Sequence, residues 1–165
     1  YVKKVVFPLE ILVVVSLGAA LFHSLVSLLV LLVTFAMLNG FIHWTAIFAP
    51  LVLLPLMMMS LGFGWILSSL GVFVRDIGQL IGVFTTALLF LSPVFFPVSA
   101  LPESFQPWLN LNPLTFIIEQ SREVLIWGHL PDWKGLMLYC IGAGIFSWFG
   151  FFWFQKTRKG FADVL

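Results

Sequence analysis

Charged residues are missing from most of this sequence. No Asp, Glu, Lys or Arg occurs in residues 11–74, and two further charge-free runs cover residues 77–102 and 135–155. A helix that crosses a bilayer core needs about 20 apolar residues. The first run is long enough for two crossings, with a break at Asn39-Gly40, and the other two runs each suit one. Because backbone N–H and C=O groups must be paired within hydrocarbon, these runs are expected to be helices.

The scarcity of charge excludes several classes of protein. Hydrophobic residues make up 61% of the chain, charged residues 9%, and the mean hydropathy is +1.11, values far from those of a soluble domain. At 165 residues the chain has room for one membrane bundle and no sizeable soluble domain. The net charge is only +1 and no basic stripe is present, so nucleic acid is not an expected partner. The single cysteine, Cys140, is expected to be a small buried apolar residue.

The positions of the basic residues predict how the helices are oriented. Four crossings are predicted, at about 9–37, 45–72, 78–97 and 134–154. With four crossings, six basic residues fall on one side of the membrane: Lys3, Lys4, Arg75, Lys156, Arg158 and Lys159. Only Arg122 and Lys134 fall on the other side. Because Lys and Arg are retained on the cytoplasmic side, both ends of the chain are predicted to be cytoplasmic.

The segment 98–133 is the one long extracytoplasmic stretch in this topology. It is apolar but interrupted by proline, too short to cross and too hydrophobic for an open loop. A helix is predicted from Asn112 as N-cap and Pro113 as first helical residue through 114–127, ending at Gly128. Its apolar and polar residues fall on opposite faces. Composition favours two alternatives equally: an interfacial helix that caps the bundle, or a re-entrant pair of helices that gates a pore.

Several chemistries have no motif in this chain. No Gly-x-x-x-x-Gly-Lys-Ser/Thr sequence is present, so the chain is not expected to hydrolyse ATP. His23, His43 and His129 are far apart and lack metal-ligand spacing, and we expect no catalytic, cofactor-binding or metal site. No carboxylate or lysine lies near the middle of any predicted span, where ion-coupled carriers place such groups. The energy for any transport is therefore expected to come from a partner.

Four short motifs occur in one order along the chain. They are Lys-Lys-Val-Val-Phe-Pro-Leu-Glu-Ile-Leu (3–12), Val-Arg-Asp-Ile (74–77), Leu-Ser-Pro-Val-Phe-Phe-Pro (91–97), and Asn-Pro-Leu-Thr (112–115) followed by Glu119 and Arg122. This series resembles the permease subunit of type-2 ABC exporters, in the branch that exports O-antigen and other surface polysaccharides. Teichoic-acid export permeases belong to the same branch. The resemblance covers essentially the whole chain.

The resemblance implies an architecture and partners that the residues alone do not. Permeases of this family have six transmembrane helices and act as homodimers with two copies of a separate ATP-binding subunit. The four spans would be the last four of six, so the chain is expected to be truncated at its N-terminus. Contacts with the ATP-binding subunit are implied for Lys3, Lys4, Arg75 and Asp76. The location implied is the bacterial cytoplasmic membrane.

The resemblance also implies where the gate and the conduit lie. Segment 98–128 would match a pair of gating helices that half-enter the membrane from outside, which favours the re-entrant alternative. The residues implied for the gate helix are Asn112, Pro113, Glu119 and Arg122. The conduit would run beside the third span, whose candidate sugar-facing rings are Phe84, Phe90, Phe95 and Phe96.

The function expected from the sequence is export of lipid-linked surface polysaccharide, such as O-antigen or capsule, by an ATP-driven transporter of which this chain is the permease. Within the same family the alternative substrates are teichoic acid, a drug or a lipid. A secondary transporter or channel would need an intramembrane charge pair or proton relay, and the sequence shows none. A membrane-embedded enzyme would need paired Asp, His or Ser-His groups at the interface, and no such pattern is present.

Overall fold

The computed structural model describes residues 10–74, 76–102, 104, 106–110 and 112–158, and the secondary structure of this part of the chain is entirely helical. Three helices are long and apolar enough to cross a membrane: α1 (Glu10–Asn39), the unit formed by the 3-10 helix η1 (Trp44–Phe48) and α2 (Ala49–Phe73), and α6 (Trp133–Thr157). A shorter apolar helix, α3 (Ile77–Leu91), precedes a group of short elements. These are η2 (Val98–Ala100), α4 (Gln106–Asn110), α5 (Pro113–Arg122) and the π-helix η3 (Glu123–Trp127). The predicted all-α membrane fold is thereby confirmed.

The third predicted span, 78–97, is longer than the helix found there. α3 ends at Leu91, and its 15 residues extend over about 22 Å, less than the roughly 30 Å of a bilayer core. Ser92 follows with extended backbone angles, φ −98° and ψ 146°. The residue before a proline is pushed away from helical angles, and Pro93 therefore explains why the helix stops here.

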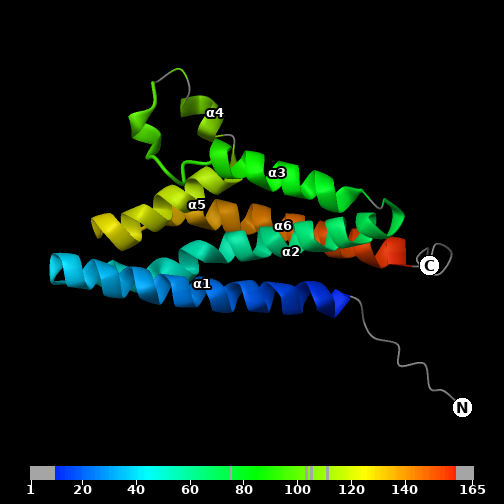
Figure 1. The fold of residues 1–165 in the computed structure, drawn as a ribbon, viewed down its shortest axis with the longest axis horizontal. Helices are drawn as coiled ribbons and strands as arrows, with labels where there is room; N and C mark the ends of the chain where they lie inside the picture. Colours follow the sequence, from blue (N-terminus) through cyan, green and yellow to red (C-terminus); the bar gives the residue numbers. More distant parts are fainter. Residues whose placement is uncertain (1–9, 75, 103, 105, 111, 159–165) are drawn as a thin grey trace, which may run out of the picture.

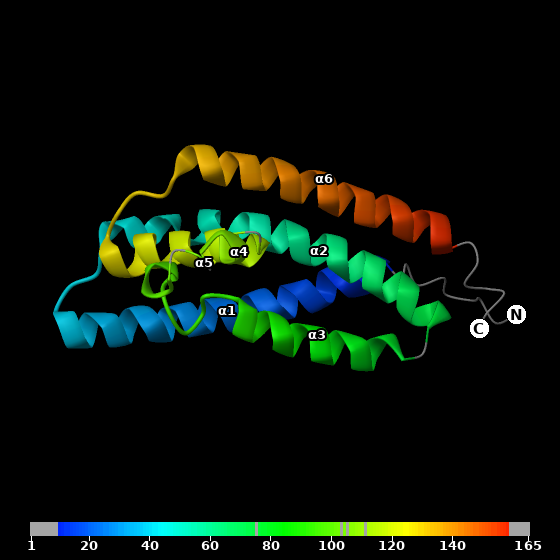
Figure 2. The same cartoon turned by 90° about the horizontal axis from the view of Figure 1, so that it is seen from above.

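The helices form a bundle with α2 at its centre. Figure 2 shows α2 between α6 on one side and α1 and α3 on the other. The start of α1, the connection between α2 and α3, and the end of α6 lie together at one end of the bundle (Figures 1 and 2). The start of α1 and the end of α6 thus share one end of the bundle with the turn that holds Asp76.

The contact between α2 and α6 is the most extensive in the bundle. Three of the buried residues on each helix recur every seven positions: Pro55, Gly62 and Ser69 on α2, and Leu136, Ala143 and Gly150 on α6. A seven-residue repeat keeps one face of a helix turned toward its partner along its whole length. At the crossing point a Cβ built on Gly150 would lie 2.5 Å from the carbonyl oxygen of Gly62, so the two backbones are in direct contact. Gly at these two positions sets how closely α2 and α6 approach.

Small residues also recur at four-residue spacing on α2, at Ser60, Gly64 and Ser68, and this stripe has a different role. The stripe predicts close approach of a neighbouring helix, and at Gly64 that neighbour is α1, whose Val13 side chain occupies the space of the missing Cβ. Ser60 and Gly64 also line the groove toward α3. The closest packing with α6 uses Gly62, which lies outside the stripe.

Helix α5 lies along the bundle rather than across its end. Figures 1 and 2 both show it running beside the first half of α2. Ile117 of α5 and Val124 of η3 are buried against Val52 of α2, with Phe48, Leu53, Leu56 and Phe116 packed around them. The apolar face predicted for this helix thus faces α2, and α5 lies within the bundle and not on its end.

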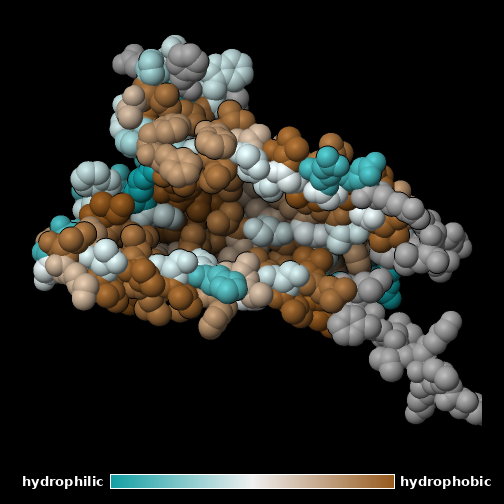
Figure 3. Space-filling view, in the orientation of Figure 1, coloured by the Kyte–Doolittle hydropathy of each residue, from teal (hydrophilic) through white to brown (hydrophobic). Residues whose placement is uncertain are grey.

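The surface of the bundle is largely apolar along its length. Figure 3 shows brown, hydrophobic residues over much of α1 and α3, with a hollow between these two helices. α1 has no buried residue, and large side chains such as Phe22, Leu25 and Val30 are exposed along it. Such a surface is suited to lipid or to other transmembrane helices and not to water.

Candidate gate and conduit site

The start of α5 is fixed by Asn112, as the sequence predicts. The Asn112 Oδ1 accepts a hydrogen bond from the backbone N–H of Leu114 at 3.0 Å, which caps the helix, and Pro113 occupies its first turn. The Nδ2 of the same side chain donates to the hydroxyl of Ser92, at 2.9 Å. Ser92 is buried and immediately follows α3. Asn112 therefore both caps α5 and ties it to the end of α3.

Arg122 holds the irregular chain that follows α3. Its Nη2 donates to the carbonyls of Pro93 and Val94, and its Nη1 donates to the carbonyl of Phe96 at 3.2 Å. The same Nη1 pairs with the Glu119 carboxylate at 2.7 Å. Irregular backbone inside a membrane is tolerated only where its polar groups find hydrogen-bond partners. Arg122 is the partner of three carbonyls in this segment.

Glu119 completes this arrangement. Its Oε1, besides pairing with Arg122, accepts from the backbone N–H of Val98 at 3.3 Å. The four residues predicted for the gate helix, Asn112, Pro113, Glu119 and Arg122, thus lie on one helix, and three of them bind segment 92–98. We call this set of contacts the α5 clamp.

The far end of α5 is joined to the connection between α1 and α2. The buried Thr45 hydroxyl donates to the carbonyl of Val124 at 2.6 Å, in the π-helical turn that extends α5. Gly128 then ends the helix with φ +73°, as predicted, and the His43 ring occupies the space where a Cβ would lie. The sequence does not predict this role of Thr45, because a single hydroxyl in an apolar run carries no signal of its partner.

Two of the predicted conduit rings line a small cavity beside the α5 clamp. Its volume is about 460 Å³, and its wall consists of three aromatic rings, four leucines, one amide and one proline: Phe90, Phe96, Trp108, Leu88, Leu91, Leu101, Leu109, Asn112 and Pro113. Trp108 is 73% exposed and was not among the predicted rings, because its place after Pro107 marks it only as an interfacial residue. Aromatic rings and one amide are the side chains that contact the faces and hydroxyls of sugars.

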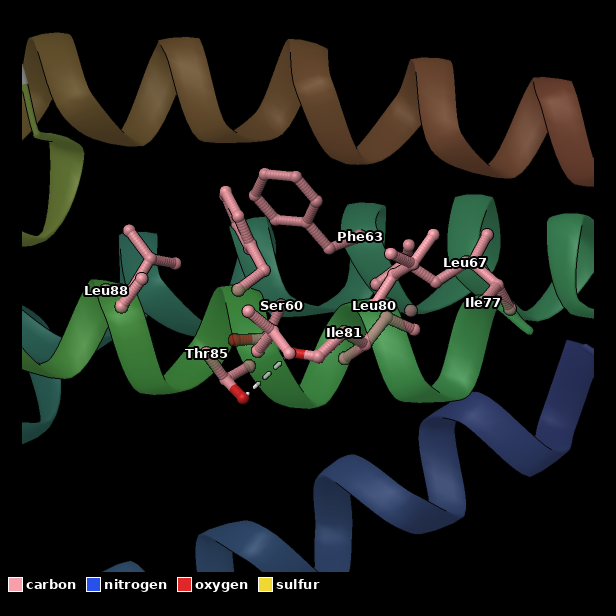
Figure 4. A pocket seen from close by; sticks show the side chains of 12 residues that line it. Ser60, Phe63, Leu67, Ile77, Leu80, Ile81, Thr85 and Leu88 are labelled. Atoms are coloured by element: carbon pink, nitrogen blue, oxygen red, sulfur yellow. Dashed lines mark hydrogen bonds between the residues drawn. The ribbon is translucent and has the colours of Figure 1, made fainter.

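Phe84 and Phe95 lie elsewhere. Phe84 lines a groove of about 880 Å³ between α2 and α3, shown in Figure 4 with Ser60, Phe63 and Leu67 on one wall and Leu80, Ile81 and Leu88 on the other. The lining is apolar except for Ser60 and Thr85, and the Thr85 hydroxyl donates to carbonyls of its own helix. Phe95 is 70% exposed and lines neither cavity. The four predicted rings therefore do not form one surface in this chain.

The predicted contacts for an ATP-binding subunit fall mostly outside the described residues. Lys3, Lys4 and Arg75 are not among them. Asp76 precedes α3 at the end of the bundle that also holds Glu10 and Arg158 (Figure 1). Within the part of the chain that the structure describes, no group of three or more His, Cys, Asp or Glu side chains is placed to hold a metal ion.

Comparison with known proteins gives the family. The family model described as ABC-2 type transporter matches residues 1–126. The chain belongs to the ABC-2 type transporter family. Membership confirms the resemblance drawn from the sequence motifs, and together with the three long apolar helices it makes the chain a multi-pass membrane protein.

The relatives of this ABC-2 chain are named for export of polysaccharide. An O-antigen export system permease protein RfbA of Myxococcus xanthus is 25% identical over 98% of this chain and 63% of its own length. A protein of the same name from Klebsiella pneumoniae is 25% identical over 99% of the chain and 63% of its own length. The polysialic acid transport protein KpsM of Escherichia coli is 26% identical over 76% of the chain and 48% of its own length. The chain thus spans less than two thirds of these relatives.

Proposed function

We propose that this ABC-2 chain is the membrane-spanning part of an ATP-driven exporter that moves a lipid-linked surface polysaccharide across the bacterial cytoplasmic membrane. The observation that carries the proposal is the similarity to O-antigen export permeases along 98% and 99% of the chain. The partners proposed are an ATP-binding-cassette subunit and a second copy of the permease. Teichoic acid, a drug or a lipid is the alternative cargo.

The geometry of the α5 clamp supports a gate in this exporter. α5 lies at depth beside α2, which suits the re-entrant alternative better than an interfacial cap. Its start is tied to the end of α3 through Asn112 and Ser92, and its far end to η1 through Thr45. A movement of α3 is thereby passed along α5 to the opposite end of the segment. We propose that this linked movement opens and closes the path to the cell exterior.

The aromatic cavity supports a sugar cargo rather than a purely apolar one. Phe90, Phe96 and Trp108 present flat rings beside the Asn112 amide at the start of the gate helix. Flat aromatic rings are suited to stack on the apolar faces of the sugar rings of a glycan. The groove of Figure 4 is lined mainly by aliphatic side chains and suits a hydrocarbon chain or an apolar helix.

The orientation proposed places both ends of the chain in the cytoplasm. Arg158 and Lys156 lie at the end of α6, at the same end of the bundle as the start of α1, whereas Lys134 lies at the opposite end of α6. The topology predicted from the sequence assigns six basic residues to this side, against Arg122 and Lys134 on the other, and such an excess is typical of a cytoplasmic side. Segment 98–133 then faces the exterior.

Trp108→Ala tests this proposal in a strain that lacks its own O-antigen permease. A longer version of the protein that includes the two helices expected upstream, co-expressed with an ATP-binding-cassette subunit, is expected to restore surface polysaccharide, and the 165-residue chain alone is not. Loss of about 1 kcal/mol of ring contact by Trp108→Ala should lower export about fivefold. Surface polysaccharide is measured by glycan staining and the protein level by immunoblot.

Trp148→Ala is the matched control, because Trp148 is also exposed but lies on α6 and lines neither cavity. It should leave export unchanged. Export that persists with a hydrolysis-deficient ATP-binding subunit would contradict the proposal and favour a secondary transporter. Equal loss in both Trp variants would contradict the role given to the aromatic cavity.

A further inference from the structure

The first residue of α1 is bound to two other helices. The Glu10 carboxylate accepts hydrogen bonds from Arg158 Nη1, at 2.8 Å to Oε1 and 2.9 Å to Oε2, and from Gln155 at 3.5 Å. Its backbone carbonyl accepts from the Trp65 indole of α2 at 3.3 Å. Glu10 therefore joins the start of α1 to the end of α6 and to the last third of α2.

Local helix chemistry explains each charge but not the pair. A carboxylate is favourable at the start of a helix and a guanidinium at the end of one, because of the helix dipole. Either side chain would meet that preference while facing water. Instead they meet across 148 residues of sequence, and Gln155 one turn earlier on α6 points to the same carboxylate. The pairing is a tertiary feature of this end of the bundle.

A second contact ties α2 to α6 at the same end. The Trp153 indole donates to the Ser69 hydroxyl at 3.0 Å, and Ser69 is buried. Together with the backbone contact of Gly62 and Gly150, this joins α2 and α6 along their length. A displacement of Glu10 is therefore transmitted to both helices.

Helix α3 is attached differently. In the part of the chain that the structure describes, the side-chain hydrogen bonds made by Thr85 and Thr86 stay within α3. A short turn joins its start to α2, where the Ile77 N–H donates to the Val74 carbonyl. Its side-chain hydrogen-bonded link is at its far end, through Ser92 and the α5 clamp, and between these ends the groove of Figure 4 separates it from α2. The bundle thus divides into a tied group, α1, α2 and α6, and a separately held α3.

We propose that Glu10 and Arg158 are a positioning pair that couples the ATP-binding subunit to the tied group. This inference rests on the proposed function, in which the segment before α1, with Lys3 and Lys4, meets that subunit. A displacement of this segment reaches Glu10 first and passes through the Glu10–Arg158 pair to α6. The tied group then shifts relative to α3, and the groove between α2 and α3 changes its width.

The experiment uses a version of the protein that includes the two helices expected upstream, purified with its ATP-binding subunit and reconstituted in vesicles, and compares export with ATP hydrolysis. Glu10→Gln and Arg158→Gln should leave the yield of complex and its ATP hydrolysis near those of the unmodified protein. Polysaccharide exported per ATP hydrolysed should fall about tenfold, because one charged hydrogen-bonded pair is lost. The double variant Glu10→Arg with Arg158→Glu should restore most of this ratio.

Lys156→Gln is the matched control, since it removes one positive charge from the exposed side of the same turn. It should leave the ratio unchanged. If the Glu10 and Arg158 variants only lower the amount of folded complex, with an unchanged ratio, the pair is structural and the inference is wrong. Failure of the double variant to restore the ratio also overturns it. If the unmodified protein binds no ATP-binding subunit, the proposed function fails, and this inference fails with it.

Discussion

Arg122 stabilises the irregular backbone that follows α3. Its guanidinium binds three carbonyls of segment 93–96 and the carboxylate of Glu119. A planar guanidinium with five N–H donors can bind several carbonyls at once, whereas a lysine ammonium has only three donors on a single nitrogen. An unpaired carbonyl away from water costs about 1–3 kcal/mol. Arg122 therefore makes it possible for α3 to end partway along the bundle.

Arg122→Lys should lower the stability of the protein while keeping its charge. Loss of at least one of the three carbonyl bonds is expected to cost about 1.5–3 kcal/mol. The thermal unfolding midpoint in detergent measures the effect. Glu119→Gln is the comparison, because its amide oxygen still accepts from Arg122, and its effect should be smaller. A larger loss with Glu119→Gln would contradict the central role given to Arg122.

At the scale of elements, the backbone contact of α2 and α6 holds the bundle together. Between transmembrane helices the hydrophobic effect supplies little attraction, because lipid tails are as apolar as the side chains. Close packing and the few interhelical hydrogen bonds then decide which faces meet. On this interface Gly62 and Gly150 supply the close packing, and Trp153 and Ser69 supply the interhelical hydrogen bond.

Gly150→Val should separate α2 from α6. Its Cβ would lie within 3.0 Å of three backbone atoms of Gly62, which have no rotamer to change, so the helices must move apart. Overpacking of this kind typically costs about 1–3 kcal/mol, and contact with backbone places the expected cost at the upper end. Gly144→Val, on the same helix with open space around it, should be nearly neutral. Equal unfolding midpoints for the two variants would show that the close contact does not hold in the membrane.

At the scale of the whole molecule, the two ends of the bundle differ in chemistry. One end holds Glu10, Asp76, Lys156 and Arg158, joined in part by the Glu10–Arg158 pair. The other holds Lys134 and the pair His129–Glu123, near the exposed rings of Trp44 and Trp127. The proposed topology assigns the first end to the cytoplasm and the second to the exterior.

Single cysteines test this topology in the Cys140→Ser background. Cysteines at Ser104 and His129 should react with a membrane-impermeant maleimide added from outside, and a cysteine at the buried Thr115 should react much more slowly. Gly128 is unsuitable as a labelling site, because a side chain there would collide with His43. Labelling of Ser104 and His129 from the cytoplasmic side alone would reverse the proposed orientation.

The amino-acid sequence by itself determined the three long helices and the two ends of the helix formed by α5 and η3. Charge-free runs predict membrane helices because unpaired backbone is too costly in hydrocarbon. Asn112-Pro113 and Gly128 predict the ends of the gate helix, because capping and left-handed backbone depend on residues a few positions apart. These interactions are local, and the order of residues along the chain is enough to reveal them.

Only the tertiary structure decided which distant residues meet. The chain has 13 glycines, and the choice of Gly62 and Gly150 as the crossing point depends on the rotation and register of two helices. The acceptors of Arg122 are backbone carbonyls, which every residue carries, so no side chain in the sequence marks them. Glu10 and Arg158 each suit their own helix terminus, and 148 residues separate them. Their pairing follows from the packing of α1, α2 and α6, because packing sets which helix ends come within hydrogen-bonding distance.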